Sequence, residues 1–194
     1  MAERDVFRIT SLCQQLLREL GLDLKDPNFT KTPERMARSL AELLAGHIDT
    51  EKQIAEELGT VFPVRKNALH LVGPVELFSL CPHHLLPVHY FCYMAYIPRK
   101  KVVGLSKLPR AARILAARAV LQEDLVEDIA DAIDGHLEPK GVLVQLTGSH
   151  DCLRIRGARS EARFTSEAVR GVMFEVPAAR QEAMELIRSS HVAD

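Results

Sequence analysis

The chain has 194 residues, of which 47% are hydrophobic and 26% are charged, and its formal net charge is −1 at pH 7. This composition is typical of a soluble globular protein. The near-zero charge excludes a general attraction to nucleic acid or to anionic membranes, so an anionic ligand would need a local basic cluster. No apolar run approaches the roughly 18 residues that would predict a membrane span.

The opening residues, MAERD, are polar and mixed in charge, so we expect no signal peptide. The chain has four cysteines, and without a secretory signal they favour a reducing compartment and thiolate chemistry over a disulfide framework. We therefore expect a cytoplasmic protein. Cys13 lies on a helical apolar stripe and Cys92 lies in a strand pattern, so both are predicted to be packing residues.

The first 60 residues or so show the spacing of amphipathic helices. Leucines recur at helical intervals up to Gly21, which is predicted to end the first helix. Thr32 followed by Pro33 is typical of the cap and first position of a second helix. Helices are therefore predicted over residues 5–21, 32–46 and 51–58. We expect residues 1–60 to form a helical arm.

From Leu69 the apolar period changes to two, which is typical of strands. In chain order we predict strands over 69–79 and 86–97, helices over 106–119 and 122–137, strands over 141–149 and 163–175, and a closing helix over 177–189. Paired strands favour an antiparallel sheet with helices on one face, an α+β layout. Residues 61–194 are expected to form this single domain.

A metal site is indicated by two short stretches that lie far apart in the sequence. The first, CPHHLLP, starts at the end of an apolar run, and a turn there brings Cys81 and His84 within reach of one ion. The second, SHDC, ends at Cys152, which offers a third ligand. Three protein ligands leave the fourth position of zinc open for water, which is the catalytic arrangement.

Two further histidines lie beside these ligands. His150 and Cys152 are two residues apart after a strand-like run, so we expect them to face the same way. His83 and His150 can then adjoin the metal without binding it, as candidate proton carriers. Taken singly, each residue is better explained as a buried thiol or a solvated loop histidine. Their combination favours a metal site.

Basic residues cluster at three places that suit an anion. Lys107 and Arg110 lie in the first turn of the helix that Ser106 is predicted to cap, where unpaired N–H groups attract phosphate. The other two clusters are Arg35 with Arg38 on the second helix, and the arginines after Cys152, Arg156 among them. Solvated surface charge is the alternative explanation. The sequence does not show whether the clusters converge.

Gln122 and Glu123 open the helix that follows. A glutamate at this position fits the helix dipole as a structural residue. Its carboxylate can also accept two N–H donors from the edge of a guanine. Chemistry alone leaves both interpretations open.

Taken together, these motifs resemble the GTP cyclohydrolase I family. The matching stretches follow the family's order and spacing from about residue 26 to the C-terminus: KTPERMAR at 31–38, CPHHLLP at 81–87, AYIP at 95–98, GLSKLPR at 104–110, QE at 122–123, HDC at 150–152 and RG at 156–157. The combination is specific, although KTPER alone would be weak.

The resemblance implies the tunnelling fold, a four-stranded antiparallel sheet backed by two helices. Subunits of that family form pentameric barrels, and two pentamers stack into a decamer with active sites at subunit boundaries. Zinc would be bound by Cys81, His84 and Cys152, and protons moved by His83 and His150. Guanine would be held by Gln122 and Glu123. The implied triphosphate site comprises Ser106, Lys107, Arg110, Arg156, Arg35 and Arg38.

The activity implied is zinc-dependent hydrolysis of GTP at C8, giving formate and 7,8-dihydroneopterin triphosphate for pterin or folate-type biosynthesis. No nucleic acid or membrane partner is expected. The chain departs from the family's pattern at Pro82, where a glutamate is usual, and at Asp124, where an arginine is usual. Two alternatives therefore stay open. One is a diverged relative that stops at a ring-opened formamidopyrimidine or uses another purine nucleotide; the other is a non-catalytic zinc-binding oligomer subunit.

Overall fold

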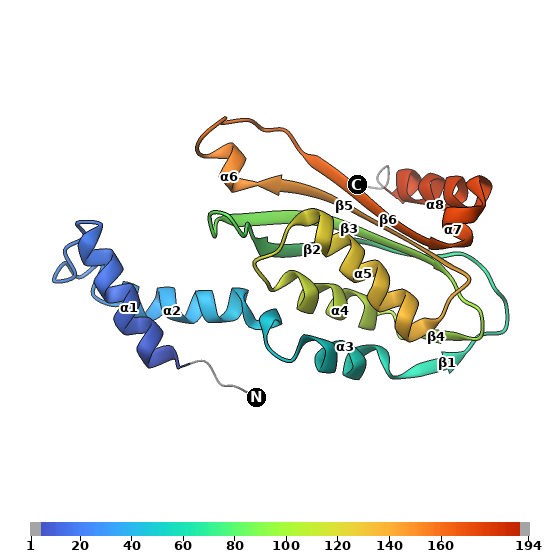
Figure 1. The fold of residues 1–194 in the computed structure, drawn as a ribbon, viewed down its shortest axis with the longest axis horizontal. Helices are drawn as coiled ribbons and strands as arrows, with labels where there is room; N and C mark the ends of the chain where they lie inside the picture. Colours follow the sequence, from blue (N-terminus) through green and yellow to red (C-terminus); the bar gives the residue numbers. More distant parts are fainter. Residues whose placement is uncertain (1–4, 191–194) are drawn as a thin grey trace.

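The computed structural model describes residues 5–190 (Figure 1). Its helices are α1 (Val6–Glu19), α2 (Thr32–Leu43), α3 (Thr50–Leu58), α4 (Lys107–Ala116), α5 (Gln122–Leu137), α6 (Asp151–Arg154), α7 (Val172–Glu175) and α8 (Pro177–Ser190), with a 3-10 turn at Ala45–His47. Its strands are β1 (Val61–Pro63), β2 (His70–Leu80), β3 (Pro87–Ile97), β4 (Lys101–Val103), β5 (Gly141–His150) and β6 (Phe164–Gly171). In this part of the chain, no helix is both long and apolar enough to cross a membrane.

The centre of the fold is a four-stranded antiparallel sheet in the order β2-β3-β5-β6. β2 and β3 form a hairpin around the CPHHLLP turn, in which Leu80 pairs with Pro87. β3 then pairs along its length with β5, so that Val88 lies opposite His150. β1 and β4 pair as a separate small ribbon. The pairing brings the turn after β2 and the end of β5 to the same end of the sheet.

Helices α4 and α5 cover one face of the sheet and enclose the main hydrophobic core (Figure 1). Alternate residues of β3 point into this core, as the strand period requires, and Tyr90, Cys92 and Met94 are each 0% exposed. α5 contributes residues spaced four apart, as in the buried stripe of a helix: Leu125, Ile129, Ile133 and Leu137. α3 packs against α4 and α5 and buries Ile54 and Leu58 in the same core. The predicted α+β class, a four-stranded antiparallel sheet backed by two helices, is confirmed.

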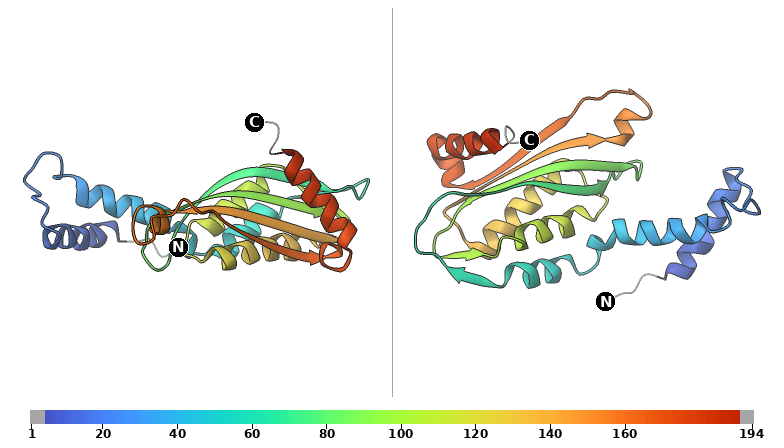
Figure 2. Two further views of the ribbon diagram at one scale, coloured as in Figure 1. Left: turned by 90° about the horizontal axis from the view of Figure 1, so that it is seen from above. Right: turned by 180° about the vertical axis from the view of Figure 1, so that it is seen from behind.

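The other face of the sheet is also covered, at one end, by α8 (Figure 2). Tyr93, Ala95 and Leu143 point away from α4 and α5 and pack against Ala183 and Ile187 of α8. The sequence predicted helices on one face only. That prediction was wrong for α8, because the direction in which the chain leaves β6 does not show in the local pattern of the helix.

The last strand is shorter than the predicted 163–175, because β6 ends at Gly171 and α7 follows directly. Gly171 has φ +55°, and a Cβ at this position would lie 2.3 Å from the carbonyl oxygen of Lys140. Glycine therefore allows the chain to leave the sheet here, where a larger residue would collide with the backbone. The short elements β1 and α6 were also missed, since three or four residues are too few to show a period.

In the N-terminal arm, α1 and α2 pack against each other and project away from the sheet (Figure 2). α2 already includes Thr32, so that Lys31 occupies the N-cap position predicted for Thr32, and Pro33 lies in its first turn. α1 buries Cys13 and Leu17, so the packing role predicted for Cys13 is confirmed. Other apolar side chains of α1 and its C-cap residue are exposed: Phe7 (86%), Leu12 (57%), Leu16 (47%) and the C-cap Leu20 (64%).

The burial of α3 leads to a stability prediction. Leu58 is 0% exposed, and Leu58→Ala should lower the free energy of unfolding by about 2–5 kcal/mol, because a cavity remains in the core. Urea denaturation followed by circular dichroism measures the change. Leu105→Ala is the control, since Leu105 is 81% exposed and its loss should change stability by less than about 0.5 kcal/mol. Equal stabilities would contradict the packing of α3 in the core.

Candidate active site and metal centre

Backbone hydrogen bonds close the turn between β2 and β3. The N–H of Cys81 donates to the carbonyl oxygen of Leu86 at 2.8 Å, and the N–H of Leu85 donates to that of Cys81 at 2.8 Å. Leu85 takes a left-handed conformation with φ +51°, which is uncommon outside glycine and asparagine. The tight turn brings the His84 ring back toward Cys81, with Nδ1 3.6 Å from Sγ.

The second half of the site lies where β5 ends. β5 stops at His150, and the chain enters the short helix α6 at Asp151. The sequence predicted that His150 and Cys152 face the same way because strand side chains alternate. That reason was wrong, because Cys152 lies on a helical turn and not on the strand. Both residues nevertheless border one pocket, since the turn of α6 directs Cys152 back toward the sheet.

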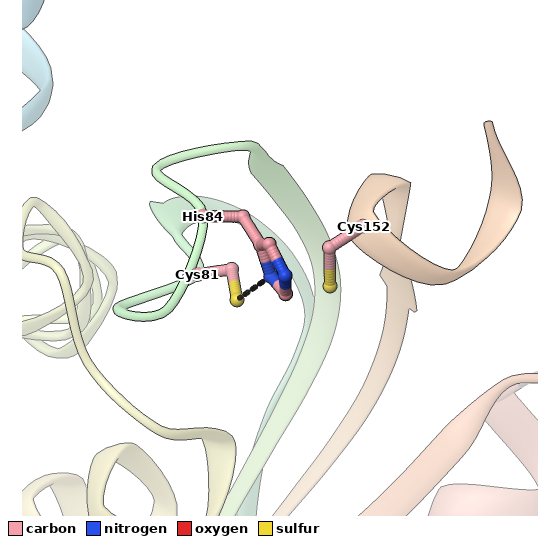
Figure 3. Close-up of side chains that lie close together, drawn as sticks. All are labelled: Cys81, His84 and Cys152. Carbon is pink, nitrogen blue, oxygen red and sulfur yellow. Dashed lines mark hydrogen bonds between the residues drawn. The ribbon is translucent and has the colours of Figure 1, made fainter. Parts of the chain in front are cut away.

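Cys81, His84 and Cys152 come together as possible metal ligands (Figure 3). One donor atom of each residue lies within 4.8 Å of the donor atoms of the other two. Donors bound to one tetrahedral zinc ion would lie roughly 3.5–3.8 Å apart, given bond lengths of about 2.1 and 2.3 Å. The 3.6 Å between Cys81 Sγ and His84 Nδ1 agrees with this spacing, and Cys152 approaches from α6 on the other side (Figure 3).

The electrostatics of the three residues also favour a bound cation. Burial raises the pKa of the Cys152 thiol, and the neighbouring Cys81 raises it further. Two adjacent thiolates repel each other, and a divalent cation removes that repulsion by taking the place of the proton. Two sulfurs and an imidazole nitrogen form the soft ligand set that suits zinc. The residues present therefore fit a metal of this kind.

Cys92 is remote from this group and fully buried in the core. Burial alone raises the pKa of its thiol well above the usual range, so the thiol stays neutral. Its predicted role as a packing residue is confirmed.

His150 lies between the possible metal ligands and the start of α5. Its Nε2 is 2.9 Å from Oε1 of Gln122, and its ring is edge-on to that of Tyr90, with the centroids 6.0 Å apart. Burial lowers the pKa of His150, and the negative charge of Glu123 opposes this effect. The environment therefore favours a neutral imidazole, in which one nitrogen donates and the other accepts.

These side chains border a pocket of about 380 Å³, which is within the size range of small-molecule sites. Its polar lining includes Cys81, His83, Glu123, His150 and Cys152. The hollow among α3, α4 and α5 is larger, at about 1010 Å³, but none of the motif residues lines it. Of these two pockets, the smaller one is therefore the one that the motif residues line.

The apolar wall of this pocket was not predicted. It comes from segments that are separate in the sequence: Val120, Leu121, Leu153 and Phe164. Phe164 begins β6 and is 46% exposed, so its ring offers a surface to a planar ligand. No sequence signal marks these residues, because each is an ordinary apolar residue, in a short helix, at the start of a strand or in the connection before α5.

The two residues predicted to bind guanine, Gln122 and Glu123, differ in their exposure. Gln122 is 1% exposed, and its Nε2 donates to the carbonyl oxygens of Leu146 (3.1 Å) and Phe164 (3.0 Å) and to Oγ of Ser166 (3.0 Å). Glu123 is exposed in the first turn of α5 and borders the pocket. The protein itself thus already engages the polar atoms of Gln122, whereas Glu123 faces the ligand space.

Lys107 and Arg110 lie at the far end of α4. The Nζ of Lys107 is 3.0 Å from the carboxylate of Glu57, and the guanidinium of Arg110 is 3.9 Å from it. Ser106 precedes them, and its side chain does not make the capping hydrogen bond that the sequence predicted. At the C-terminal end of α4, backbone hydrogen bonds join the following residues, Arg118 and Val120, to Leu80, which precedes the possible metal ligand Cys81. The 10 residues of α4 span roughly 15 Å, so one chain does not bring the two groups together.

The remaining predicted phosphate ligands are also spread out. Arg35 and Arg38 are exposed on α2, and Arg38 forms an ion pair with Glu34 at 2.8 Å. Arg156 is exposed in the loop after α6 and is close enough to Cys152 for its charge to act on that thiol. Of the predicted basic clusters, the structure brings the one after Cys152 to the metal ligands of the same chain.

Comparisons with known proteins agree with this geometry. A family model described as GTP cyclohydrolase I matches residues 9–188. GTP cyclohydrolase 1 of Carboxydothermus hydrogenoformans is 40% identical over 185 residues, which cover 94% of this chain and 95% of that protein. GTP cyclohydrolase 1 of Desulforamulus reducens is 39% identical over 188 residues, covering 96% and 99%, and that of Dictyostelium discoideum is 37% identical over 182 residues, covering 93% and 77%. The chain therefore belongs to the GTP cyclohydrolase I family.

Proposed function

We propose that this chain is a zinc-dependent enzyme that hydrolyses GTP at C8 and forms formate and 7,8-dihydroneopterin triphosphate. One observation carries the proposal: two of the three possible metal ligands (Cys81 and Cys152), a half-buried histidine and an exposed carboxylate line the same pocket of about 380 Å³, and His84 completes the ligand group beside them. Membership of the family supports the choice of GTP as substrate. The expected cytoplasmic location and the biosynthetic role belong to the same proposal.

Zinc is the metal we propose, held by Cys81, His84 and Cys152. Bound there, it would supply hydroxide near neutral pH, because it lowers the pKa of water. The three residues come from the β2–β3 turn and from α6, so the ligand set forms only in the folded chain.

The guanine base would enter the pocket between Glu123 and the apolar wall. The Glu123 carboxylate can accept two N–H donors from the guanine edge, a pairing that rejects bases without those donors. Phe164 and Leu153 line the same pocket and would exclude water from the base. This arrangement favours the ligand-binding interpretation of Glu123 over the purely structural one.

His150 would carry out the first proton transfer. It borders the pocket beside the ligands, so its neutral imidazole can take up the proton that the attacking water loses and pass it to the ring nitrogen that is released when the five-membered ring of guanine opens. His83 is exposed on the turn, with its Nδ1 3.8 Å from Sγ of Cys81. It would move protons in the later steps, in which formate leaves and the opened ribose closes onto the amino groups.

The triphosphate would be held by a neighbouring chain. Ser106 and Arg110 line a hollow of about 640 Å³ that runs along the edge strand β2. The guanine pocket lies beside Phe164 at the start of the other edge strand, β6. Pairing of β6 with β2 of the next chain would bring the two hollows together, with Lys107 from that chain beside them. Arg156 would contribute from the pocket's own chain, and Arg35 and Arg38 from a projecting arm.

We therefore propose a homo-oligomer, on the family's pattern a decamer of two pentamers. Within the described residues, no further strand pairs with either edge of the sheet, apart from a single bridge between Leu80 at the end of β2 and Ala119, and these open edges support closure into a ring. The apolar side chains that α1 exposes support a further contact through the arm. The division into an arm of residues 1–60 and a catalytic domain of residues 61–194 remains a proposal, with α3 sharing the core of the catalytic domain.

A second candidate function is favoured by Pro82, which lines the pocket where the family usually has a glutamate. Without that carboxylate beside His83, later proton transfers would be slower, and a ring-opened formamidopyrimidine would be released. Analysis of the reaction products by mass spectrometry distinguishes this enzyme from one that completes the reaction. Unchanged GTP would indicate a non-catalytic subunit or an enzyme that uses another purine substrate.

The metal assignment is tested by two cysteine substitutions. Cys152→Ala should lose most of the bound zinc, because two ligands hold the ion far less tightly than three. Cys92→Ala should keep one zinc per chain, since Cys92 lies in the core away from the site. Metal content after gel filtration, measured by mass spectrometry, decides the outcome. Stoichiometric zinc in Cys152→Ala would show that the ligand set is wrong.

The catalytic assignment is tested with zinc-loaded protein and GTP. His150→Ala should keep zinc and GTP binding but lose about 10²–10⁴-fold in rate. His83→Ala should still open the ring and accumulate the formamide intermediate. Mass spectrometry of intermediate and product measures both, and His136→Ala on α5, outside the pocket, is the control. A wild-type rate in His150→Ala would contradict the mechanism at its first step.

The shared site is tested by co-expressing two inactive variants. His150→Ala damages the guanine pocket, and Arg110→Ala damages the phosphate cluster, so each homo-oligomer should be nearly inactive. A ring interface joins different surfaces of two chains, so each site would combine the guanine pocket of one chain with the phosphate cluster of the next. Random mixing of equal amounts then pairs two intact halves in about a quarter of the sites, and activity returns to that extent. Light scattering checks assembly. Mixed oligomers without recovered activity would indicate a site contained in one chain.

A further inference from the structure

Gln122 is a buried polar residue in contact with a proposed catalytic group. Its side chain is 1% exposed, and all of its polar atoms face protein groups. The sequence placed it with Glu123 as a contact to guanine. A ligand edge cannot reach an amide that is enclosed in this way without displacing its existing partners.

The orientation of the Gln122 amide follows from its surroundings. Its Nε2 is within 3.1 Å of three acceptors, the carbonyl oxygens of Leu146 and Phe164 and Oγ of Ser166. An exchange of nitrogen and oxygen would leave the oxygen facing the two carbonyl oxygens, with no hydrogen between them. The amide nitrogen must therefore point toward β5 and β6, and Oε1 must point toward His150.

This orientation determines which nitrogen of His150 carries a hydrogen. Oε1 of Gln122 can only accept, and it lies 2.9 Å from Nε2 of His150. That contact is a hydrogen bond only if Nε2 is the donor. In the neutral ring the hydrogen is then on Nε2, and Nδ1 is the nitrogen with the lone pair.

A glycine on β5 makes room for the contact. A Cβ at Gly148 would lie 2.4 Å from Oε1 of Gln122 and 2.8 Å from the ring of Tyr90. Any larger residue would push the amide away from His150. Tyr90 fixes the other side of the imidazole by its edge-on contact. The position of the His150 ring is therefore set by two buried side chains, Gln122 (1% exposed) and Tyr90 (0% exposed).

We infer that Gln122 is a positioning residue, which holds His150 as the Nε2–H tautomer so that Nδ1 is the atom that exchanges protons with the substrate. The inference rests on the proposed function for its last step. The tautomer itself follows from hydrogen bonding alone. By analogy with partners that orient metal-bound histidines, loss of this contact should lower kcat by about 10–100-fold.

The first test needs no substrate. Zinc-loaded wild-type protein is labelled with ¹⁵N in histidine only, and solid-state NMR separates the two neutral tautomers by their ring nitrogen shifts. Subtraction of the His150→Asn spectrum isolates His150. The Nε2–H form is expected, and a dominant Nδ1–H form would overturn the inference. This outcome is independent of whether the protein converts GTP, so failure of the proposed function is seen separately in the product assay.

The second test uses variants of Gln122. Gln122→Met removes the acceptor at nearly constant volume and should mix the His150 tautomers and lower kcat, with KM for GTP within about twofold of wild type. Gln145→Met is the matched control, because Gln145 is half-buried on the same strand as His150 and its amide contacts Met184.

Two results of the variant series would overturn the inference. A raised KM with unchanged kcat in Gln122→Met would show a contact to guanine, and an unchanged His150 spectrum would show that Gln122 does not set the tautomer. If Gln122→Met does not fold, Gly148→Ala displaces the same amide from the neighbouring strand. It should then give the same loss of kcat and the same mixing of tautomers.

Discussion

The pairing of β3 with β5 is the constraint on which the site depends. Val88 lies opposite His150, so the turn that carries Cys81 and the segment that carries Cys152 end at the same corner of the sheet. A slip of one residue would turn every side chain of β5 to the other face. It would remove His150 from the pocket and Leu146 from the core. The apolar contacts that fix this register therefore hold the possible metal ligands in place together with the fold.

Two kinds of polar side chain meet at this corner. Gln122 and Tyr90 are buried and hydrogen-bonded, Tyr90 through Oγ of Ser79 at 3.2 Å, and burial raises the pKa of Tyr90 to about 12. Buried polar groups are tolerated only when they are paired, so these side chains have little freedom to move. Glu123 and His83 are exposed and can follow a ligand. Catalysis requires reacting groups that are held in a fixed orientation, which the buried side chains provide. The exposed side chains are free to contact the ligand.

The basic half of the proposed site obeys a different constraint. Lys107 is about three-quarters buried and needs a negative partner, which Glu57 supplies from α3. The same α3 packs in the core through Leu58, so the core also holds the ammonium at the start of α4. This location is a helix length away from Cys152. Function in the proposed enzyme would then require assembly, with the phosphate cluster of one chain serving the pocket of the next, as proposed above.

The sequence by itself determined the long helices and strands and the α+β class, because these depend on residues close together in the chain. Cys81 and His84, three residues apart, signalled a metal site before any fold was known. Tertiary structure alone decided that Gln122 faces inward while Glu123 faces the pocket, and that Lys107 lies far from Cys152. It also ended β6 at Gly171, through contact with Lys140. These features depend on strand register and helix rotation, which are set by the packing of the whole core, and no local pattern records where two distant segments meet.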